Sequence, residues 1–169
     1  EIAGPHSFMP PETLQFLEQN AAVETIDTFR ALELPFREQP ISVAVVRGSD
    51  RRNLRFIHGR SDEIMRRFYD EQCVLASESF ARRFHVAVGD VMELPTPSGR
   101  RAFPVAGIFY NYTNDQGLVF LSEKNFKALW HDDRVNSVAV YLKPGVSAVV
   151  VANAFRERFS GRGEFSIYS

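Results

Sequence analysis

The chain has 169 residues, of which 44% are hydrophobic and 24% charged, and its formal net charge is -1. This composition is typical of a folded globular protein and excludes a disordered chain, and the balanced charge argues against a nucleic-acid partner. The single cysteine, Cys73, rules out an internal disulfide and therefore a small disulfide-stapled scaffold. The longest candidate apolar run, Ala148 to Ala152, is far shorter than the ~20 residues of a membrane-spanning helix, and no signal peptide is visible at Glu1.

A helix and two strands are predicted in the first fifty residues. Pro11 suits the first position of a short helix. Residues 23–30 are rich in β-branched and aromatic side chains, and residues 41–45 alternate in polarity, so each segment predicts a strand. Pro35 and Pro40 bracket the connection that we expect between these strands.

The rest of the chain alternates between helix and strand patterns. The elements expected in the middle are an extended piece over 55–57, a helix capped by Ser61, a buried strand over 73–76, a helix over 78–84 capped by Ser77, and a hairpin of strands 91–94 and 101–109 joined through 97–99. Those expected in the last third are a strand over 118–121, a helix from Ser122 to Trp130, a strand over 135–143, a helix capped by Ser147, and a strand over 165–168. This series predicts helices lying on a sheet, in a mixed α/β or α+β fold.

No organised catalytic or metal-binding pattern is found among the ionisable residues. None of the four histidines is paired with another at the spacing of a helical metal site. The sequence His131-Asp132-Asp133 favours a polar turn, because consecutive residues on a helix do not converge on one ion. The acids Asp62, Glu63, Asp70 and Glu71 lie on a charged amphipathic segment that favours solvent exposure. We therefore expect no catalytic, cofactor-binding or metal-binding residue, and no cofactor in this chain.

One enzymatic alternative stays open. Ser77 or Ser79 with His85 would suit a small serine hydrolase or peptidase. Neither serine lies in a Gly-x-Ser-x-Gly elbow, and both stand at a predicted helix start, which favours a capping role.

A loop rich in aromatic and polar residues is the candidate contact site. Tyr110, Tyr112, Asn114 and Asp115 follow the strand that ends at Phe109, and aromatic residues beside a loop tip can anchor a partner or cargo. The alternative is that Phe109 belongs to the core and the tyrosines cover it.

Several phrases together resemble a known family. They are Phe56-Ile57-His58-Gly59-Arg60, Val74-Leu75-Ala76-Ser77-Glu78-Ser79-Phe80-Ala81, Val88-Gly89-Asp90-Val91, Phe103-Pro104-Val105-Ala106-Gly107-Ile108, Gly117-Leu118-Val119-Phe120-Leu121, and the strand and turn from Val135 to Gly145. The order and spacing of these sequence segments resemble those in the periplasmic core domain of MacB/FtsX-like ABC-transporter permeases. The resemblance is strongest from Leu54 to Gly145 and weakest in the first fifty residues.

The resemblance implies a non-catalytic domain on the side of the membrane away from the ATPase, facing the periplasm or cell exterior. It implies a porter-like β-α-β lobe, over 1–53 together with 102–169, and a smaller inserted α+β lobe over 54–101. The implied partners are an ATPase subunit that binds the ATP, reached through membrane helices, a second permease copy or homologue, and an unidentified cargo or adaptor. The implied role is cargo or partner binding and mechanical coupling of ATP-driven transport. A stand-alone secreted binding module is a further alternative.

Overall fold

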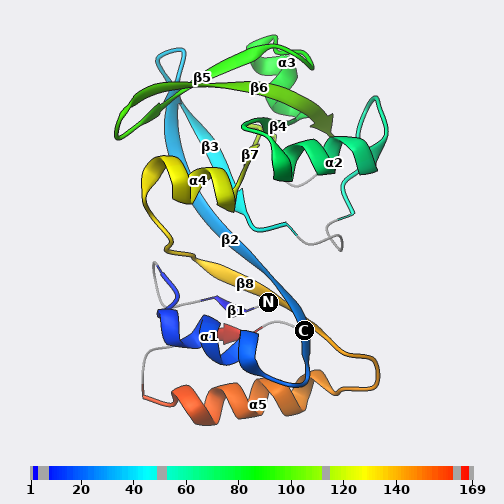
Figure 1. Ribbon diagram of the computed structural model, residues 1–169, viewed down its shortest axis with the longest axis vertical. Helices are drawn as coiled ribbons and strands as arrows, with labels where there is room; N and C mark the ends of the chain where they lie inside the picture. The colour runs from blue at the N-terminus through cyan, green and yellow to red at the C-terminus, as the bar shows by residue number, and fades with distance from the viewer. Residues whose placement is uncertain (1, 4–7, 49–52, 112–114, 162–164, 168–169) are drawn as a thin grey trace. The chain divides into compact units, whose positions relative to one another are not determined.

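The computed structural model describes residues 2–3, 8–48, 53–111, 115–161 and 165–167. The chain divides into two compact units (Figure 1). Unit 1 comprises residues 1–30 and 134–169, and unit 2 comprises residues 31–133. Unit 2 is therefore inserted into unit 1, and the chain passes between the units at Arg30/Ala31 and at Asp133/Arg134.

Unit 1 is a small sheet covered by two helices. Its elements are β1 (Ile2–Ala3), α1 (Pro11–Gln19), the first part of β2 (Val23–Phe36), β8 (Ser137–Leu142), α5 (Ala148–Phe159) and β9 (Ser166–Ile167). The strand order is β2-β8-β1-β9, and these neighbours pair antiparallel. In this register Ile2 lies opposite Ile167, so the first and last strands of the chain lie side by side.

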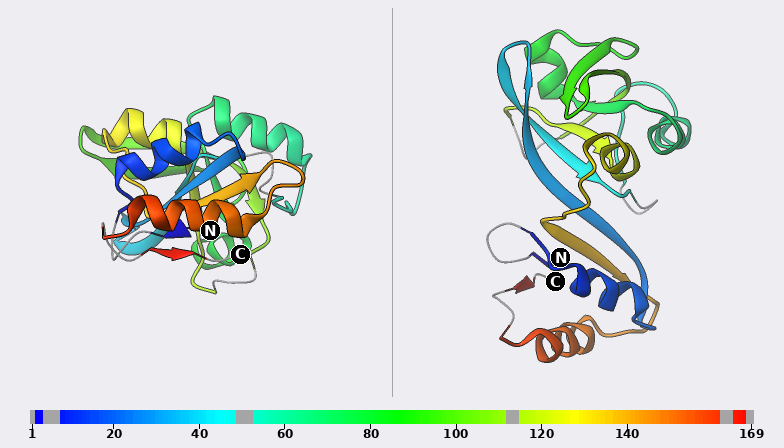
Figure 2. Two further views of the ribbon diagram at one scale, coloured as in Figure 1. Left: turned by 90° about the horizontal axis from the view of Figure 1, so that it is seen from below. Right: turned by 60° about the vertical axis from the view of Figure 1, so that its left-hand side comes forward.

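The core of unit 1 is aromatic. Phe155 and Phe159 of α5 recur at a helical spacing and are buried, and Phe16 of α1 meets both rings edge-on at centroid distances of 6.2 and 5.5 Å. Leu17 and Val138, which are fully buried, belong to the same apolar cluster. Helices α1 and α5 therefore pack on each other and on the strands of unit 1, as two views show (Figure 2).

Unit 2 is a mixed sheet with three helices described. Its elements are the end of β2, β3 (Gln39–Val46), α2 (Ser61–Asp70), β4 (Val74–Ser77), α3 (Glu78–Phe84), β5 (Val91–Thr96), β6 (Gly99–Phe109), β7 (Val119–Ser122) and α4 (Glu123–Trp130). The strand order is β5-β6-β4-β7-β3-β2. Strand β4 pairs parallel with β6 and antiparallel with β7, which itself pairs parallel with β3.

A register shift in unit 2 decides which side chains of β6 face α2. Val74 lies opposite Val105, but the next residue, Leu75, lies opposite Gly107, so Ala106 is an extra residue in β6. Such a bulge reverses the facing of the residues that follow it. A side chain at Gly107 would accordingly point at Ile64 of α2, 2.7 Å from its Cγ2 atom.

The structure confirms the expected α+β class, the hairpin of β5 and β6, and two serine caps. The Ser77 and Ser122 hydroxyls accept hydrogen bonds from the third residue after each, Phe80 and Asn125, both at 3.3 Å. Ser61 was expected to cap α2, but it is the first helical residue, and Arg60 occupies the N-cap position without a side-chain cap bond. Ser147 does occupy the N-cap position of α5, but its side chain makes no cap bond.

Two strands near the N-terminus differ from the expectation. Strand β2 does not end at residue 30 but continues through Pro35 to Phe36. The connection to β3 is only a tight turn, in which Arg37 and Glu38 both have positive φ, and the exposed prolines 35 and 40 lie inside the strands. Strand β1 was not expected, because only its pairing with β8 and β9 defines it. The predicted lobes, 1–53 with 102–169 and 54–101, have boundaries other than those of the two units and stay a prediction.

Candidate partner-contact loop

The candidate loop connects β6 to β7 in unit 2. Tyr110 is 37% exposed and Asp115 is exposed, so both are accessible to a partner. Tyr112 and Asn114 lie outside the described residues. Phe109 is only 1% exposed and stacks on Phe120, with ring centroids 4.7 Å apart, so it belongs to the core as the alternative proposed.

The start of the loop is held by the extended piece over 55–57. The Tyr110 N–H donates to the Arg55 carbonyl at 2.9 Å, and the Ile57 N–H donates to the Ile108 carbonyl at 2.9 Å. Between them, Phe56 forms an antiparallel bridge with Phe109. The backbone of Tyr110 is therefore fixed where the loop begins.

The end of the loop is anchored by Ser77. The Ser77 N–H donates to the Leu118 carbonyl at 2.8 Å, and the Leu118 N–H donates to Ser77 Oγ at 2.9 Å. The same oxygen caps α3 by accepting from the Phe80 N–H. One fully buried hydroxyl thus ties the loop end to the helix start.

Gly117 and Arg83 add a second anchor. Gly117 has φ +90°, and a Cβ built there would lie 2.7 Å from the Phe80 backbone, so a side chain does not fit. The Arg83 guanidinium donates to the Gln116 carbonyl and side-chain oxygens, both at 3.3 Å, and to Gln39 Oε1 at 3.0 Å. Both ends of the loop are therefore held by contacts within unit 2.

The sequence did not indicate these anchors. Ser77 was expected to cap a helix, with a nucleophilic role as the open alternative, and neither role predicts a bond to the loop. Arg83 lies 33 residues from Gln116, and Ser77 lies 41 residues from Leu118, so no local pattern could pair them. In the sequence, Gly117 and Leu118 stand out only through the family resemblance.

The geometry argues against Ser77 as the nucleophile of the serine-hydrolase alternative. Ser77 is fully buried and its oxygen accepts two backbone bonds. His85 is the C-cap of α3, at the opposite end of the helix from Ser77. Eight residues of rise separate them by about 12 Å along the helix axis, far beyond hydrogen-bond reach.

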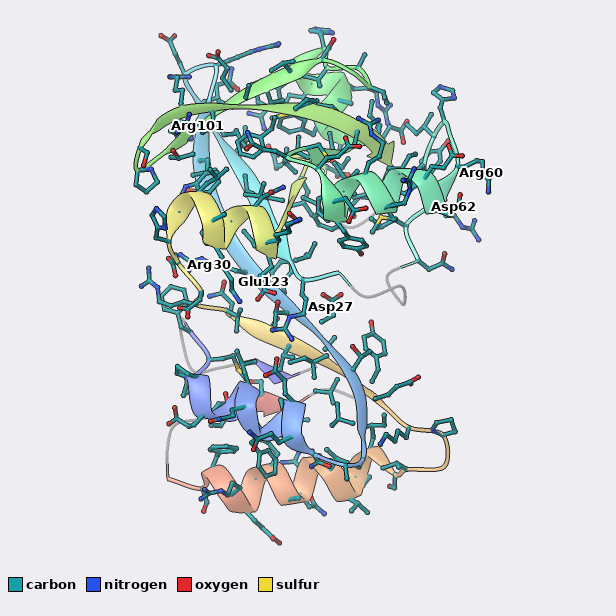
Figure 3. The ribbon with its side chains drawn as sticks, viewed as in Figure 1. Asp27, Arg30, Arg60, Asp62, Arg101 and Glu123 are labelled. Atoms are coloured by element: carbon teal, nitrogen blue, oxygen red, sulfur yellow. The ribbon has the colours of Figure 1, made fainter. Side chains whose placement is uncertain are left out.

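The other ionisable candidates have structural roles. His131 is the left-handed C-cap of α4, and the described residues contain no group of three or more potential metal ligands. A hydrogen bond from Arg60 lowers the pKa of the exposed Asp62, and the two side chains lie together at the start of α2 (Figure 3). Burial raises the pKa of the Cys73 thiol to about 11, so the thiol is neutral near pH 7.

A partly buried ion pair joins Arg47, the residue that follows β3, to Glu123 at the start of α4 within unit 2. Arg47 Nε donates to Glu123 at 2.9 Å, and Lys127 lies 3.1 Å from the other carboxylate oxygen. Burial alone would raise the pKa of Glu123, but Arg47 and Lys127 outweigh it, and the pKa lies below its ordinary value. This pair secures the start of α4 rather than forming a reactive group.

Comparisons with known proteins identify the family. The MacB-like periplasmic core domain matches residues 4–158, which is most of the chain. The chain belongs to this family. A curated relative, an uncharacterized ABC transporter permease protein of Mycobacterium tuberculosis, is 31% identical over 120 residues, which cover 70% of the chain. The match covers 14% of that relative, so this MacB-like domain spans only a small part of its length.

Solved structures share the fold of this MacB-like domain. The periplasmic region of MacB from Actinobacillus actinomycetemcomitans has a TM-score of 0.72 at 13% identity, with 99% of this chain and 86% of that one covered. The extracellular domain of the noncanonic ABC-type transporter YknZ from Gram-positive bacteria has a TM-score of 0.64 at 11% identity, with both chains fully covered.

The family assignment also indicates on which side of the membrane the domain lies. It is an extracytoplasmic domain of the MacB type from ABC transporter permeases. Among the helices that the structure describes, none has the length and apolar character needed to span a bilayer.

Proposed function

We propose that this domain couples ATP-driven movement of membrane helices to partner or cargo contact outside the membrane. The observation that carries the proposal is the pairing of β1 with β9, in which Ile2 lies opposite Ile167. Opposed residues of antiparallel strands have Cα atoms about 5 Å apart. Membrane helices attached before β1 and after β9 would therefore reach unit 1 at neighbouring points.

The chain connectivity supports transmission from unit 1 to unit 2. Strand β2 begins in unit 1 and continues into unit 2 without a break, and the only other covalent passage is at Asp133/Arg134. In this proposal the continuous strand β2, rather than a loose linker, carries a displacement of unit 1 toward unit 2. The energy source in this proposal is ATP bound by a separate subunit, which biases two arrangements of the domain.

The contact itself is assigned to the loop over 110–117, referred to below as the contact loop. Its anchored ends present Tyr110 and Asp115 to solvent. A loop with fixed ends loses less conformational entropy on binding than a free one, which favours affinity. The implied partners are a second permease copy and a cargo or adaptor that meets this loop.

Hydrogen exchange in the full-length permease, assembled with its ATPase subunit in nanodiscs, tests the coupling. We expect ATP, bound under conditions that block hydrolysis, to change amide exchange in unit 2, across the membrane from the nucleotide. Exchange in unit 2 that is identical with and without ATP would show that the domain does not receive the movement. The matched control is a permease assembled with an ATPase variant that cannot bind ATP.

A further inference from the structure

The two passages between the units are bordered on the unit 1 side by two arginines, and the side chain of the first is hydrogen-bonded to the backbone of the second. Arg30 is the last residue of unit 1 before the insertion, and Arg134 is the first residue after it. Arg30 is only 9% exposed, and its guanidinium donates to the Arg134 carbonyl at 3.2 Å. Figure 3 labels Arg30 on β2. The side chain of Arg30 at one passage thus binds the backbone of Arg134 at the other.

Both guanidinium groups lie against one aromatic ring. The central carbon of Arg30 is 4.9 Å from the centroid of Phe8, and that of Arg134 is 4.4 Å from it. Each cation is attracted by the negative face of the ring. Two like charges repel each other when brought together, so the Phe8 ring supplies attraction that offsets this repulsion.

Backbone hydrogen bonds hold the neighbours of these three residues in place. The Met9 N–H donates to the Val135 carbonyl at 2.7 Å, and the Asn136 N–H donates to the Phe29 carbonyl at 2.9 Å. The residue after Phe8 and the residue before Arg30 are therefore each bonded to the segment that starts at Arg134. All of these contacts lie inside unit 1.

We propose that Phe8, Arg30 and Arg134 form a clamp that transmits displacement of the N-terminal strand to both passages at once. Phe8 follows β1 by five residues, and β1 pairs with β8 and β9. This inference rests on the proposed function, in which a membrane helix precedes β1. Phe8 in that case lies between the membrane and unit 2 along the chain, and its ring contacts the arginines at both routes into unit 2.

The first experiment tests whether the clamp holds the backbone at the two passages, without asking whether it transmits movement. Amide exchange is followed by mass spectrometry in the full-length permease in nanodiscs, on peptides that contain Met9 and Asn136. Replacing the ring by an aliphatic side chain, Phe8→Leu, is expected to speed exchange in both peptides about tenfold, the factor that two cation–π contacts supply. Phe8→Tyr keeps the ring and is expected to exchange at the wild-type rate.

Two further variants separate the clamp from general damage. Arg30→Met removes one cation and its hydrogen bond and is expected to act like Phe8→Leu. Arg101→Met removes an exposed arginine of unit 2 and is expected to change neither peptide (Figure 3). Unchanged exchange in the peptides of Phe155 and Leu118 shows that both units stay folded. Wild-type exchange at Met9 and Asn136 in both Phe8→Leu and Arg30→Met would overturn the clamp.

The second experiment asks whether the clamp transmits. The ATP-dependent change in unit 2 exchange is expected to be lost in Phe8→Leu and kept in Phe8→Tyr. If Phe8→Leu speeds exchange at the passages but keeps the full ATP response, the clamp stabilises unit 1 without transmitting, and the inference is wrong. If the wild type itself shows no ATP response, the proposed function fails, whereas the first experiment still decides whether the clamp exists.

Discussion

Ser77 and Leu118, 41 residues apart in the sequence, exchange two hydrogen bonds: each donates its backbone N–H, one to a carbonyl at 2.8 Å and the other to the serine hydroxyl at 2.9 Å. The serine that caps α3 is therefore also the residue that fixes the end of the contact loop. A side chain that looks like a simple helix cap in the sequence positions a surface in the folded domain.

Ser77→Ala is expected to destabilise the chain by about 2–3 kcal/mol, because it removes a cap and leaves the Leu118 N–H without its acceptor. The matched control is Ser122→Ala, which removes a buried cap of the same 3.3 Å geometry from α4. That control is expected to cost about 1 kcal/mol. Urea denaturation measures both, and equal losses in the two variants would contradict the double role of Ser77.

Gly117→Ala is expected to lower the urea midpoint strongly, because alanine is strained at φ +90° and its Cβ would lie 2.7 Å from the Phe80 backbone. Gly89→Ala is the control, since Gly89 has φ +92° and no atom within 4 Å of a built Cβ. The control isolates the backbone strain of about 1–2 kcal/mol. A similar midpoint in both variants would mean that the loop end can move away from α3.

Replacing Tyr110 and Tyr112 together by alanine is expected to abolish activity of the full-length permease without lowering its amount in the membrane. The reason is the loss of aromatic contact area on the contact loop, where Tyr110 is 37% exposed. Complementation of a strain that lacks the permease gene measures this. Val88→Ala with Val91→Ala, which alters two other exposed apolar residues of unit 2, is expected to retain activity. Full complementation by the tyrosine variant would exclude the loop as the contact site.

Glu123 makes the stability of the fold depend on pH. Its folded pKa lies below its ordinary value of 4.5, so the carboxylate stabilises the fold above that pH, and the stabilisation is lost as the pH falls through the folded pKa. We expect Glu123→Gln to be less stable than the wild type at pH 7 and the difference to shrink in acid. Asp62→Asn is the control, because the pKa of Asp62 is also lowered but its ion pair with Arg60 is exposed. Urea midpoints of the wild type and of Glu123→Gln, measured from pH 3 to pH 7, check this. A difference between the two midpoints that stays constant with pH would contradict the assignment.

The sequence was informative where structure depends on near neighbours. Serine followed by a helical apolar pattern identified the starts of α3 and α4, and the turn residues 97–99 identified the hairpin of β5 and β6. The length of β2 was missed because Pro35 is normally a boundary signal. Its side chain is exposed and the strand continues past it to the turn at Arg37 and Glu38.

The candidate site was only partly accessible to sequence reasoning. The contact loop was found because aromatic and polar residues cluster in it, and Tyr110 and Asp115 are exposed as a contact role requires. Its anchors were not found, since Arg83 and Ser77 meet it through tertiary contacts. The Phe8 clamp has no local pattern either, because residues 8, 30 and 134 come together only when the two passages are formed.

The insertion of unit 2 into unit 1 has a consequence for biosynthesis. Every residue of unit 2 has been made by the time Asp133 is translated, whereas unit 1 still lacks β8, α5 and β9. Domains generally fold as units during synthesis, so unit 2 can mature while the first helix of unit 1 waits for its partners. Helix α1, β1 and the start of β2 therefore emerge first but finish last, and their apolar side chains are the ones that a chaperone outside the cytoplasm would have to shield.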